Sequence, residues 1–314
     1  MQWFVTGGSG FLGKRLIATL HQCGDRVVAL ARSDEAARSV AAAGAEVARG
    51  DLDALPDLGT CDAVVHAAAY VKELGRMAEY ERVNVEGTRH VMKAAGARRV
   101  IHVSTEAVLA DGHPLIRVDE TQPIAAKPLG PYALTKAKAE QVARDGGAIV
   151  VRPRLIWGDG DTSLLPQLVE AVRAKRWAWF GDGRYLTSTC HVQNVVEGIL
   201  CAAEKGKPGE VYFLTDGAPV EVRDFLTKVF ATQGIDPGTR RVPYWLAKAL
   251  TYGLAWMKRP PIAKSAFAVI AHEMTVDDTK ARRELGYTGA TTIEAGLAAM
   301  RAAASAAAPG TTAR

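Results

Sequence analysis

Cysteine is scarce in this chain, with four among 314 residues. The four show neither C-x-x-C spacing nor a histidine at a metal-ligand interval, which predicts reduced thiols and no metal site. We expect them to act as small buried hydrophobic residues. They are Cys23, Cys61, Cys190 and Cys201. Because the first segment resembles a strand rather than a secretory leader, the reduced thiols predict a cytoplasmic protein.

Long runs of one charge are also missing. The net charge of +5 is mild, and basic pairs such as Arg98-Arg99 and Arg240-Arg241 are isolated. The sequence therefore argues against nucleic-acid binding. The apolar segment Tyr244–Met257 is shorter than the roughly 20 residues that a membrane-spanning helix needs. We expect a lid helix over a pocket there, and an interfacial membrane contact is the less favoured alternative.

The first half of the chain alternates apolar strands with helical stretches. The expected strands are Gln2–Thr6, Arg26–Ala31, Glu46–Arg49, Ala63–Ala67, Arg99–Ser104 and Ala148–Arg152. The expected helices between them are Phe11–Gln22, Glu35–Ala43, Met77–Ala95 and Ala133–Arg144. This alternation predicts an α/β fold with a doubly wound parallel sheet of the Rossmann type, whose crossovers are right-handed.

The second half loses this alternation, because proline, glycine and tryptophan interrupt it. We expect residues 1–156, with residues 189–214 returning to them, to form the dinucleotide-binding domain. Residues 157–188 and 215–301 would form a smaller, interleaved C-terminal substrate lobe, and residues 302–314 a flexible tail. A strand is expected at Val211–Leu214, and helices at Asn194–Ala203, Val222–Gln233, Tyr244–Met257 and Asp278–Leu285.

The first predicted strand leads directly into a glycine-rich turn. A dinucleotide site needs such a turn, because backbone without Cβ atoms lets the pyrophosphate approach the N–H groups at the start of the following helix. The position of the turn, after a strand and before an amphipathic helix, makes the motif more specific than a glycine-rich loop alone. The residues expected to bind the cofactor here are Gly7, Gly10, Phe11, Leu12 and Gly13.

The end of the second strand indicates which dinucleotide is bound. Sites for NAD usually carry an acidic residue at this position, which binds the ribose 2′-hydroxyl. Arg32 stands there instead, and a guanidinium suits a 2′-phosphate. Asp34 and Glu35 follow a little later, where they would cap the next helix. The sequence therefore favours NADP(H) over NAD(H).

Two other strand ends are expected to border the cofactor. Asp51 and Leu52 follow the third strand, where the adenine ring would lie. Ala67 and Ala68 follow the fourth strand, and small residues there let the backbone lie close to the cofactor. His66 precedes them and is expected to be structural.

A Tyr-x-x-x-Lys pair begins the helix after the fifth strand. The spacing places Tyr132 and Lys136 on one face of that helix. A nearby ammonium, helped by an oxidised nicotinamide, would lower the pKa of the phenol toward the working range of an acid-base group. Ser104 and Thr105 stand at the end of the fifth strand, at the sheet edge where ligands bind, so one hydroxyl could bond the substrate oxygen beside Tyr132.

Together these motifs resemble an extended short-chain dehydrogenase/reductase. Within that group the chain resembles the NAD(P)-dependent epimerase/dehydratase family, particularly its 3β-hydroxysteroid dehydrogenase-like branch. The resemblance implies that Tyr132 is the acid-base group, that Lys136 binds the cofactor ribose and modulates the pKa of Tyr132, and that Thr105 is the hydroxyl donor, with Ser104 as the alternative. It also implies that Asn84 supports the active site. Further residues carrying the resemblance are Asn84–Thr88, Val151-Arg152-Pro153 and His191–Val196.

The family covers several reactions, so the sequence must discriminate among them. Sugar-nucleotide dehydratases of this group follow the catalytic threonine with Asp-Glu, whereas Glu106-Ala107 follows Thr105 here, which argues against dehydration. Arg32 argues less strongly against an NAD-dependent nucleotide-sugar epimerase, which stays an alternative. A non-catalytic NADP-binding regulatory protein is a second alternative, but such relatives usually lose the Tyr-Lys pair.

The predicted lobe is rich in aromatic residues, which favours a hydrophobic ketone or secondary alcohol, steroid-like or long-chain, as the substrate. About half of these rings are expected to form core instead. The sequence thus predicts an NADP-dependent oxidoreductase. Family members often dimerise through helices flanking the fifth strand, so a homodimer is a further expectation. The aromatic residues are Trp157, Trp177, Trp179, Phe180, Tyr185, Tyr244, Trp245, Tyr252 and Trp256.

Overall fold

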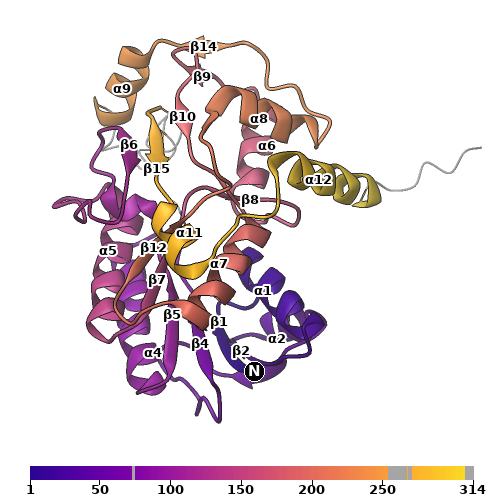
Figure 1. The fold of residues 1–314 in the computed structure, drawn as a ribbon. Helices are drawn as coiled ribbons and strands as arrows, with labels where there is room; N and C mark the ends of the chain where they lie inside the picture. The colour runs from indigo at the N-terminus through magenta and orange to yellow at the C-terminus, as the bar shows by residue number, and fades with distance from the viewer. Residues whose placement is uncertain (73–74, 254–266, 268–270, 308–314) are drawn as a thin grey trace, which may run out of the picture.

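A seven-stranded parallel sheet lies at the centre of the protein. The computed structural model describes residues 1–72, 75–253, 267 and 271–307. The strand order is β12-β7-β5-β4-β1-β2-β3 (Figure 1). This order confirms the predicted doubly wound Rossmann sheet, and the strand expected at Val211–Leu214 is its seventh member. The strands are β1 (Gln2–Thr6), β2 (Arg26–Ala31), β3 (Glu46–Arg49), β4 (Ala63–His66), β5 (Arg99–Val103), β7 (Ile149–Pro153) and β12 (Val211–Leu214).

Helices cover both faces of this sheet. Side chains alternate along β1: Trp3 and Val5 pack on one face, and Phe4 packs on the other. The first face is covered by α1 (Phe11–Gln22), α2 (Asp34–Ala42), α7 (Val192–Lys205) and α11 (Thr279–Leu285). The second is covered by α4 (Gly87–Ala95) and α5 (Gly130–Asp145). The strand edges between these layers are where the site forms.

The helix expected at Met77–Ala95 is present along its whole length, but its middle part is not α-helical. It consists of α3 (Met77–Tyr80), the π-helical segment η1 (Glu81–Glu86) and α4. Segments of π-helix are rare, and they occur frequently at functional sites. Here the wide turn contains Asn84, which the sequence predicted to support the active site.

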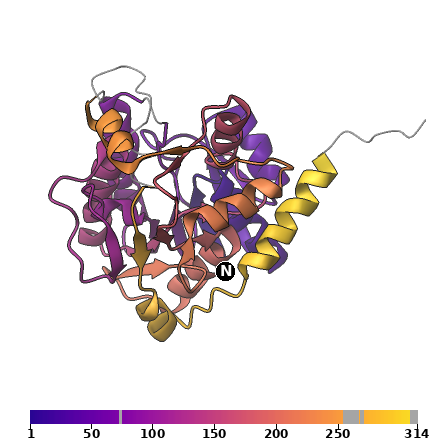
Figure 2. The ribbon, with the colours of Figure 1, turned by 90° about the horizontal axis from the view of Figure 1, so that it is seen from above.

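The lobe above the sheet contains α6 (Leu165–Arg173), α8 (Val222–Ala231), α9 (Tyr244–Gly253) and α12 (Ile293–Ala307). Figure 2 shows α12 lying beside α8. Short strands accompany these helices. The sequence did not reveal them, because such short segments show no periodicity. They are β6 (Leu115–Val118), β8 (Ile156–Trp157), β9 (Trp179–Phe180), β10 (Leu186–Thr187), β11 (Cys190–His191), β13 (Val220–Glu221), β14 (Arg241–Val242) and β15 (Met274–Val276).

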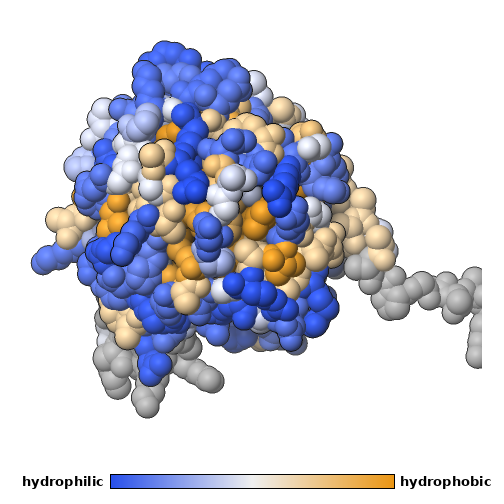
Figure 3. All heavy atoms as spheres, turned by 90° about the horizontal axis from the view of Figure 1, so that it is seen from below, coloured by the Kyte–Doolittle hydropathy of each residue, from blue (hydrophilic) through white to orange (hydrophobic). Residues whose placement is uncertain are grey.

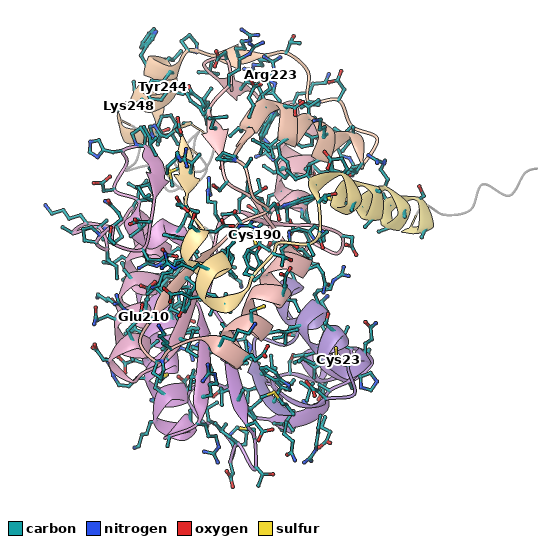
Figure 4. All side chains as sticks on the ribbon, viewed as in Figure 1. Cys23, Cys190, Glu210, Arg223, Tyr244 and Lys248 are labelled. Atoms are coloured by element: carbon teal, nitrogen blue, oxygen red, sulfur yellow. The ribbon has the colours of Figure 1, made fainter. Side chains whose placement is uncertain are left out.

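Three tryptophans of the lobe form its core rather than a binding surface. Trp157, Trp177 and Trp179 are buried with Phe225 and Phe230, and their rings meet edge to face. These three therefore belong to the aromatic residues that were expected to form core. Trp245 behaves differently, because 70% of it is exposed on α9. Figure 4 labels its neighbours Tyr244 and Lys248 at the end of the lobe far from the sheet.

Two of the expected segments reach beyond the described residues. The alanine-rich segment from residue 302 was expected to be a flexible tail, but α12 continues through it to Ala307, because alanine has the highest helix propensity. Residues 308–314 lie outside the described residues. The part of the predicted helix Tyr244–Met257 that follows Gly253 also lies outside them, as do Trp256 and the side chain of Tyr252.

The surface is mixed in its hydropathy. Hydrophilic residues cover most of the face that carries the amino ends of the strands, with hydrophobic residues between them (Figure 3). Among the described helices, none is both long and apolar enough to cross a membrane. All four cysteines are free; Cys190 is buried as expected, whereas Cys23 is exposed.

Candidate active site

The glycine turn between β1 and α1 forms a backbone cradle. Gly7 has φ +75°, and a Cβ on it would lie 2.6 Å from the amide nitrogen of Ala68. A Cβ on Gly13 would lie 2.6 Å from the Cα of Gly8. The Gly10 amide donates to the Gly7 carbonyl at 3.1 Å, which closes the turn. These close approaches explain why the sequence needs glycine at these positions.

The start of α1 offers free amide donors to a ligand. Gly10 precedes the helix and no side chain caps it, so the N–H groups of Phe11, Leu12 and Gly13 have no side-chain acceptor at this cap. Free N–H groups and the positive end of a helix dipole bind phosphate. Ala67 and Ala68 border the turn as predicted, since a Cβ on Gly7 would touch both. The arrangement therefore fits the pyrophosphate of a dinucleotide.

Arg32 lies at the carboxyl edge of β2, in the wall of an open cavity of about 570 Å³. Three further basic side chains, Lys72, Arg76 and Arg82, line the same cavity, with Glu79 as its acidic residue. Arg82 forms ion pairs with Glu79 and with an aspartate outside the cavity. The cavity thus carries an excess of positive charge where a 2′-phosphate would be bound.

The acidic residue nearest to Arg32 in the sequence is engaged elsewhere. Asp34 forms an ion pair with Arg49 at 2.6 Å. Ser33 caps α2 by accepting the amide hydrogen of Ala36. Among the described residues, Arg32 has no ion-pair partner. Its guanidinium is therefore available to an anionic ligand.

Asp51 and Leu52 shape the neighbouring part of the sheet edge. One carboxylate oxygen of Asp51 accepts the amide hydrogens of Asp53 and Ala54, each at 2.9 Å, so it closes a turn. The side chain of Leu52 packs against Gly87, where a Cβ would lie 2.7 Å from the leucine Cδ1. Both residues thus have a structural role, and the adenine contact stays a prediction.

Tyr132 and Lys136 lie one turn apart near the start of α5. Lys136 is 3% exposed, and its Nζ donates to the Val103 carbonyl at 2.7 Å. Burial lowers the pKa of Lys136 to about 8, while the charge of Glu140 acts in the opposite direction. The helix therefore places the Lys136 ammonium, with its lowered pKa, directly beneath the end of β5.

In the protein without a cofactor, the pKa of the Tyr132 phenol is raised. Burial raises it first, and the negative charge of Glu106 raises it further. A hydrogen bond with Thr105 acts in the opposite direction. The lowering expected from the ammonium together with an oxidised nicotinamide stays a prediction.

The two hydroxyls at the end of β5 point to different partners. Ser104 donates to Glu140 Oε2 at 2.6 Å, inside the buried layer under α5. Thr105 donates to Glu106 Oε2 at 2.9 Å and accepts the amide hydrogen of Ala107. Because Thr105 also bonds Tyr132, the structure brings Thr105 and not Ser104 to the phenol.

Two buried ion pairs support this constellation, and sequence reasoning missed both. Arg152 donates to Glu140 through two nitrogens, at 3.0 and 2.5 Å. Arg154 donates to Glu106 at 2.8 Å. The signal in the sequence was the presence of two arginines at the end of a buried strand, since charged residues are seldom fully buried without a partner.

Asn84 joins the loop after β4 to α5. Its side-chain oxygen accepts the Tyr70 amide hydrogen at 2.7 Å, and its nitrogen donates to Thr135 Oγ1 at 3.0 Å. Thr135 lies directly before Lys136 in the chain. Asn84 is therefore placed to support the site rather than to touch the phenol. His66 is structural, as expected, because its two ring nitrogens meet hydroxyls of Thr6 and Thr88.

Comparison with known proteins matches this arrangement to a family. The model of the 3-beta hydroxysteroid dehydrogenase/isomerase family matches residues 4–244, which include the glycine turn, Thr105 and the Tyr-Lys pair. The chain belongs to this family. It is therefore an NAD(P)-dependent enzyme of the extended short-chain dehydrogenase/reductase type, which confirms the resemblance stated from the motifs.

Relatives from bacteria match almost the whole chain. A 4-hydroxy-2-methyl-3-oxo-4-farnesyl-3,4-dihydroquinoline-1-oxide ketoreductase from Stigmatella aurantiaca is 48% identical over 322 aligned residues, covering 96% of each chain. A 2-alkyl-3-oxoalkanoate reductase from Stenotrophomonas maltophilia is 31% identical and covers 98% of this chain and 100% of its own. Both relatives are named as reductases, and this chain is an oxidoreductase.

Solved structures agree on the fold. The UDP-glucuronic acid 4-epimerase of Bacillus cereus in complex with NAD superposes with a TM-score of 0.75 over 98% of this chain and 99% of the epimerase. At 19% identity this similarity concerns the fold alone. It agrees with the Rossmann fold that the sheet order shows.

Proposed function

We propose that this enzyme reduces a ketone on a hydrophobic substrate with NADPH. The observation that carries the proposal is the meeting of Thr105, Tyr132 and Lys136 at the carboxyl edge of the sheet, next to the glycine turn. Relatives named as a ketoreductase and as a 2-alkyl-3-oxoalkanoate reductase support reduction as the reaction.

The chemistry divides between the cofactor and three side chains. The nicotinamide supplies the hydride when it is bound. Tyr132 donates its phenolic proton to the carbonyl oxygen as negative charge develops there. The Thr105 hydroxyl holds the same oxygen in place, and the ammonium of Lys136 stabilises the phenolate that remains. Asn84 keeps the start of α5, and with it the phenol, in position.

The preference for NADPH rests on Arg32 and the basic cavity around it. A guanidinium and a 2′-phosphate form charge-assisted hydrogen bonds, each worth roughly 1.5–3 kcal/mol. Arg32→Ser should therefore raise the Kd for NADPH by about tenfold to a hundredfold and leave the Kd for NADH nearly unchanged. Arg38→Ser, an exposed change on α2, is the matched control. Equal losses for the two cofactors would contradict the preference.

The substrate class is supported by the names of two relatives, a farnesyl-dihydroquinoline-oxide ketoreductase and a 2-alkyl-3-oxoalkanoate reductase. An apolar pocket in the lobe has a volume of only about 20 Å³, which holds about one water molecule and no substrate. Leu155, Leu164, Leu168 and Phe225 line it together with Thr187. Thr187 accepts a hydrogen bond from Arg154 at 3.1 Å, and Arg154 binds Glu106 next to Thr105.

A cofactor-dependent screen tests this function. NADPH and NADH are each offered with ketones of graded size, with nucleotide sugars as the competing class. We expect the highest kcat/KM for a bulky apolar ketone with NADPH. Better turnover of a nucleotide sugar would overturn the proposal in favour of an epimerase. The cytoplasmic location, the homodimer and the lid role of the segment at residues 244–257 stay predictions.

A further inference from the structure

Two buried hydroxyls flank the imidazole of His66, between the glycine turn and helix α5. His66 is 1% exposed, and neither Thr6 nor Thr88 is more exposed than the ring. Thr6 Oγ1 lies 2.7 Å from Nδ1 of the ring, and Thr88 Oγ1 lies 2.9 Å from Nε2. Because both nitrogens are engaged away from water, their neighbours determine which of them carries the hydrogen.

The hydrogen of each hydroxyl can be assigned from its second contact. Thr88 Oγ1 lies 2.6 Å from the backbone carbonyl of Asn84, which can only accept, so Thr88 donates there. Thr88 then has no hydrogen left for the ring, so Nε2 of His66 carries the proton and donates to it. Burial lowers the pKa of His66 to about 3, so the ring is neutral and Nδ1 has no hydrogen. Nδ1 therefore accepts from Thr6, whose oxygen accepts the Ala68 amide hydrogen at 3.3 Å.

The chain of hydrogen bonds continues from Asn84 to the helix that carries Tyr132. The side-chain amide of Asn84 donates to Thr135 Oγ1 at 3.0 Å, and this hydroxyl donates to the Pro131 carbonyl at 2.8 Å. Asn84 also accepts the amide hydrogen of Tyr70, in the wall of the basic cavity. The π-helical turn η1 contains Asn84. The chain thus runs from the strand end beside the glycine turn to the residue directly before Tyr132.

We infer that His66 is a positioning residue, which ties the glycine turn to the first turn of α5 through Thr88 and Asn84. The inference rests on the proposed reduction, because it concerns where the phenol of Tyr132 stands relative to a cofactor held at the glycine turn. The direction of each hydrogen bond follows from the next one, so the buried chain has a single arrangement. A break at the ring would let α5 shift against the turn, and a misplacement of about 1 Å can cost about a hundredfold in rate.

Two substitutions break the chain on opposite sides of the ring. The amide oxygen in His66→Asn takes the place of Nδ1 and can accept from Thr6, but this side chain ends short of Thr88. The amide nitrogen in His66→Gln takes the place of Nε2 and can donate to Thr88, but Thr6 loses its acceptor. His66→Leu removes both bonds. His102→Leu is the matched control, because His102 is an equally buried imidazole on the neighbouring strand, and its ring nitrogens have no hydrogen-bond partner in the part of the chain that the structure describes.

The first measurement is kcat for ketone reduction with saturating NADPH. We expect kcat to fall about tenfold in His66→Asn and in His66→Gln, and further in His66→Leu, whereas His102→Leu stays within about twofold. Thr88→Val breaks the next link and keeps the side-chain shape. If His66 acts through Thr88, adding His66→Leu to Thr88→Val lowers kcat by less than about threefold more. Effects that multiply, or an equal loss in His102→Leu, overturn the inference.

A second measurement needs no turnover. Hydrogen exchange of the amides at residues 134–138 reports how firmly the start of α5 is held, and circular dichroism shows whether each variant is folded. We expect faster exchange there in the three His66 variants and in Thr88→Val than in His102→Leu. Thr88→Val provides the comparison if a His66 variant fails to fold. Unaltered exchange in the folded variants overturns the inference, whereas absence of ketone reduction by the unchanged enzyme, with exchange as expected, overturns the proposed function alone.

Discussion

The parallel sheet and the lobe above it contribute differently to this enzyme. Central strands of the sheet have four to six residues, and the sheet edge carries the glycine turn and Thr105. The lobe has strands of two to four residues, and aromatic rings fill its core. The regular strands of the parallel sheet therefore place the reacting groups, whereas the irregularly packed lobe covers the substrate.

The largest expected difference between the two regions concerns their ion pairs. Arg152→Met leaves the buried carboxylate of Glu140 without its partner, so the free energy of unfolding should fall by about 3–5 kcal/mol. Lys228→Met breaks the exposed pair with Asp224 on α8 and should cost less than about 1 kcal/mol. Urea denaturation of both variants measures the contrast. Equal costs would show that the buried pair does not stabilise the sheet region.

A glycine substitution gives the next largest contrast. Gly13→Ala forces a Cβ against the turn, so the Kd for NADPH should rise about a hundredfold, equivalent to roughly 3 kcal/mol. Gly253→Ala, on α9, places its Cβ in open space and should leave the Kd unchanged. Fluorescence titration of NADPH provides the measurement. Retained affinity in Gly13→Ala would mean that the turn is not the phosphate cradle.

The histidines beneath the sheet edge should make the protein sensitive to acid. Burial lowers the pKa of His66 to about 3 and lowers that of His102 well below 6.5. The unfolded chain takes up these protons near pH 6.5 and the folded chain does not, so stability falls as pH drops from about 6.5 toward 3.

His102→Leu removes one of these groups, and both ring nitrogens of His102 lack a partner among the described residues. Relative to the unchanged chain, the variant should gain about 2 kcal/mol more stability at pH 5 than at pH 8, since each pKa unit is worth about 1.4 kcal/mol. His21→Gln, an exposed change, is the control. Parallel pH curves for all three proteins would contradict the expected linkage.

The smallest effects are expected in the lobe. Trp177→Phe should lower the free energy of unfolding by about 1–2 kcal/mol and leave KM for every ketone unchanged, because Trp177 belongs to the core. Leu164→Trp overfills the small apolar pocket of the lobe and should lower the free energy of unfolding by about 1–3 kcal/mol. If Trp177→Phe changed KM and not the free energy of unfolding, Trp177 would contact the substrate instead of belonging to the core.

Sequence reasoning succeeded where the fold repeats itself. β1, β2, β3 and α1 have the boundaries expected from periodicity and from the glycine turn. It was less successful where contacts join distant segments. The buried carboxylate of Glu106 has its ion-pair partner in Arg154, which lies 48 residues beyond Glu106 in the chain. The two-residue strands of the lobe likewise exist only through their partners.

The position of the hydroxyl donor shows the same limit. Sequence reasoning left Ser104 and Thr105 open, because a shift of one residue at a strand end exchanges the faces of the sheet. The structure separates them through their partners, since Ser104 donates to buried Glu140 while Thr105 adjoins Tyr132.

The central claim is that Tyr132 donates the proton in an NADPH-dependent ketone reduction. Tyr132→Phe keeps the ring and removes the hydroxyl, so the most direct measurement is kcat of this variant beside its Kd for NADPH. We expect kcat to fall by about 10²–10⁴-fold, the range for loss of a general acid, with the Kd essentially unchanged. Full activity in Tyr132→Phe would contradict the account.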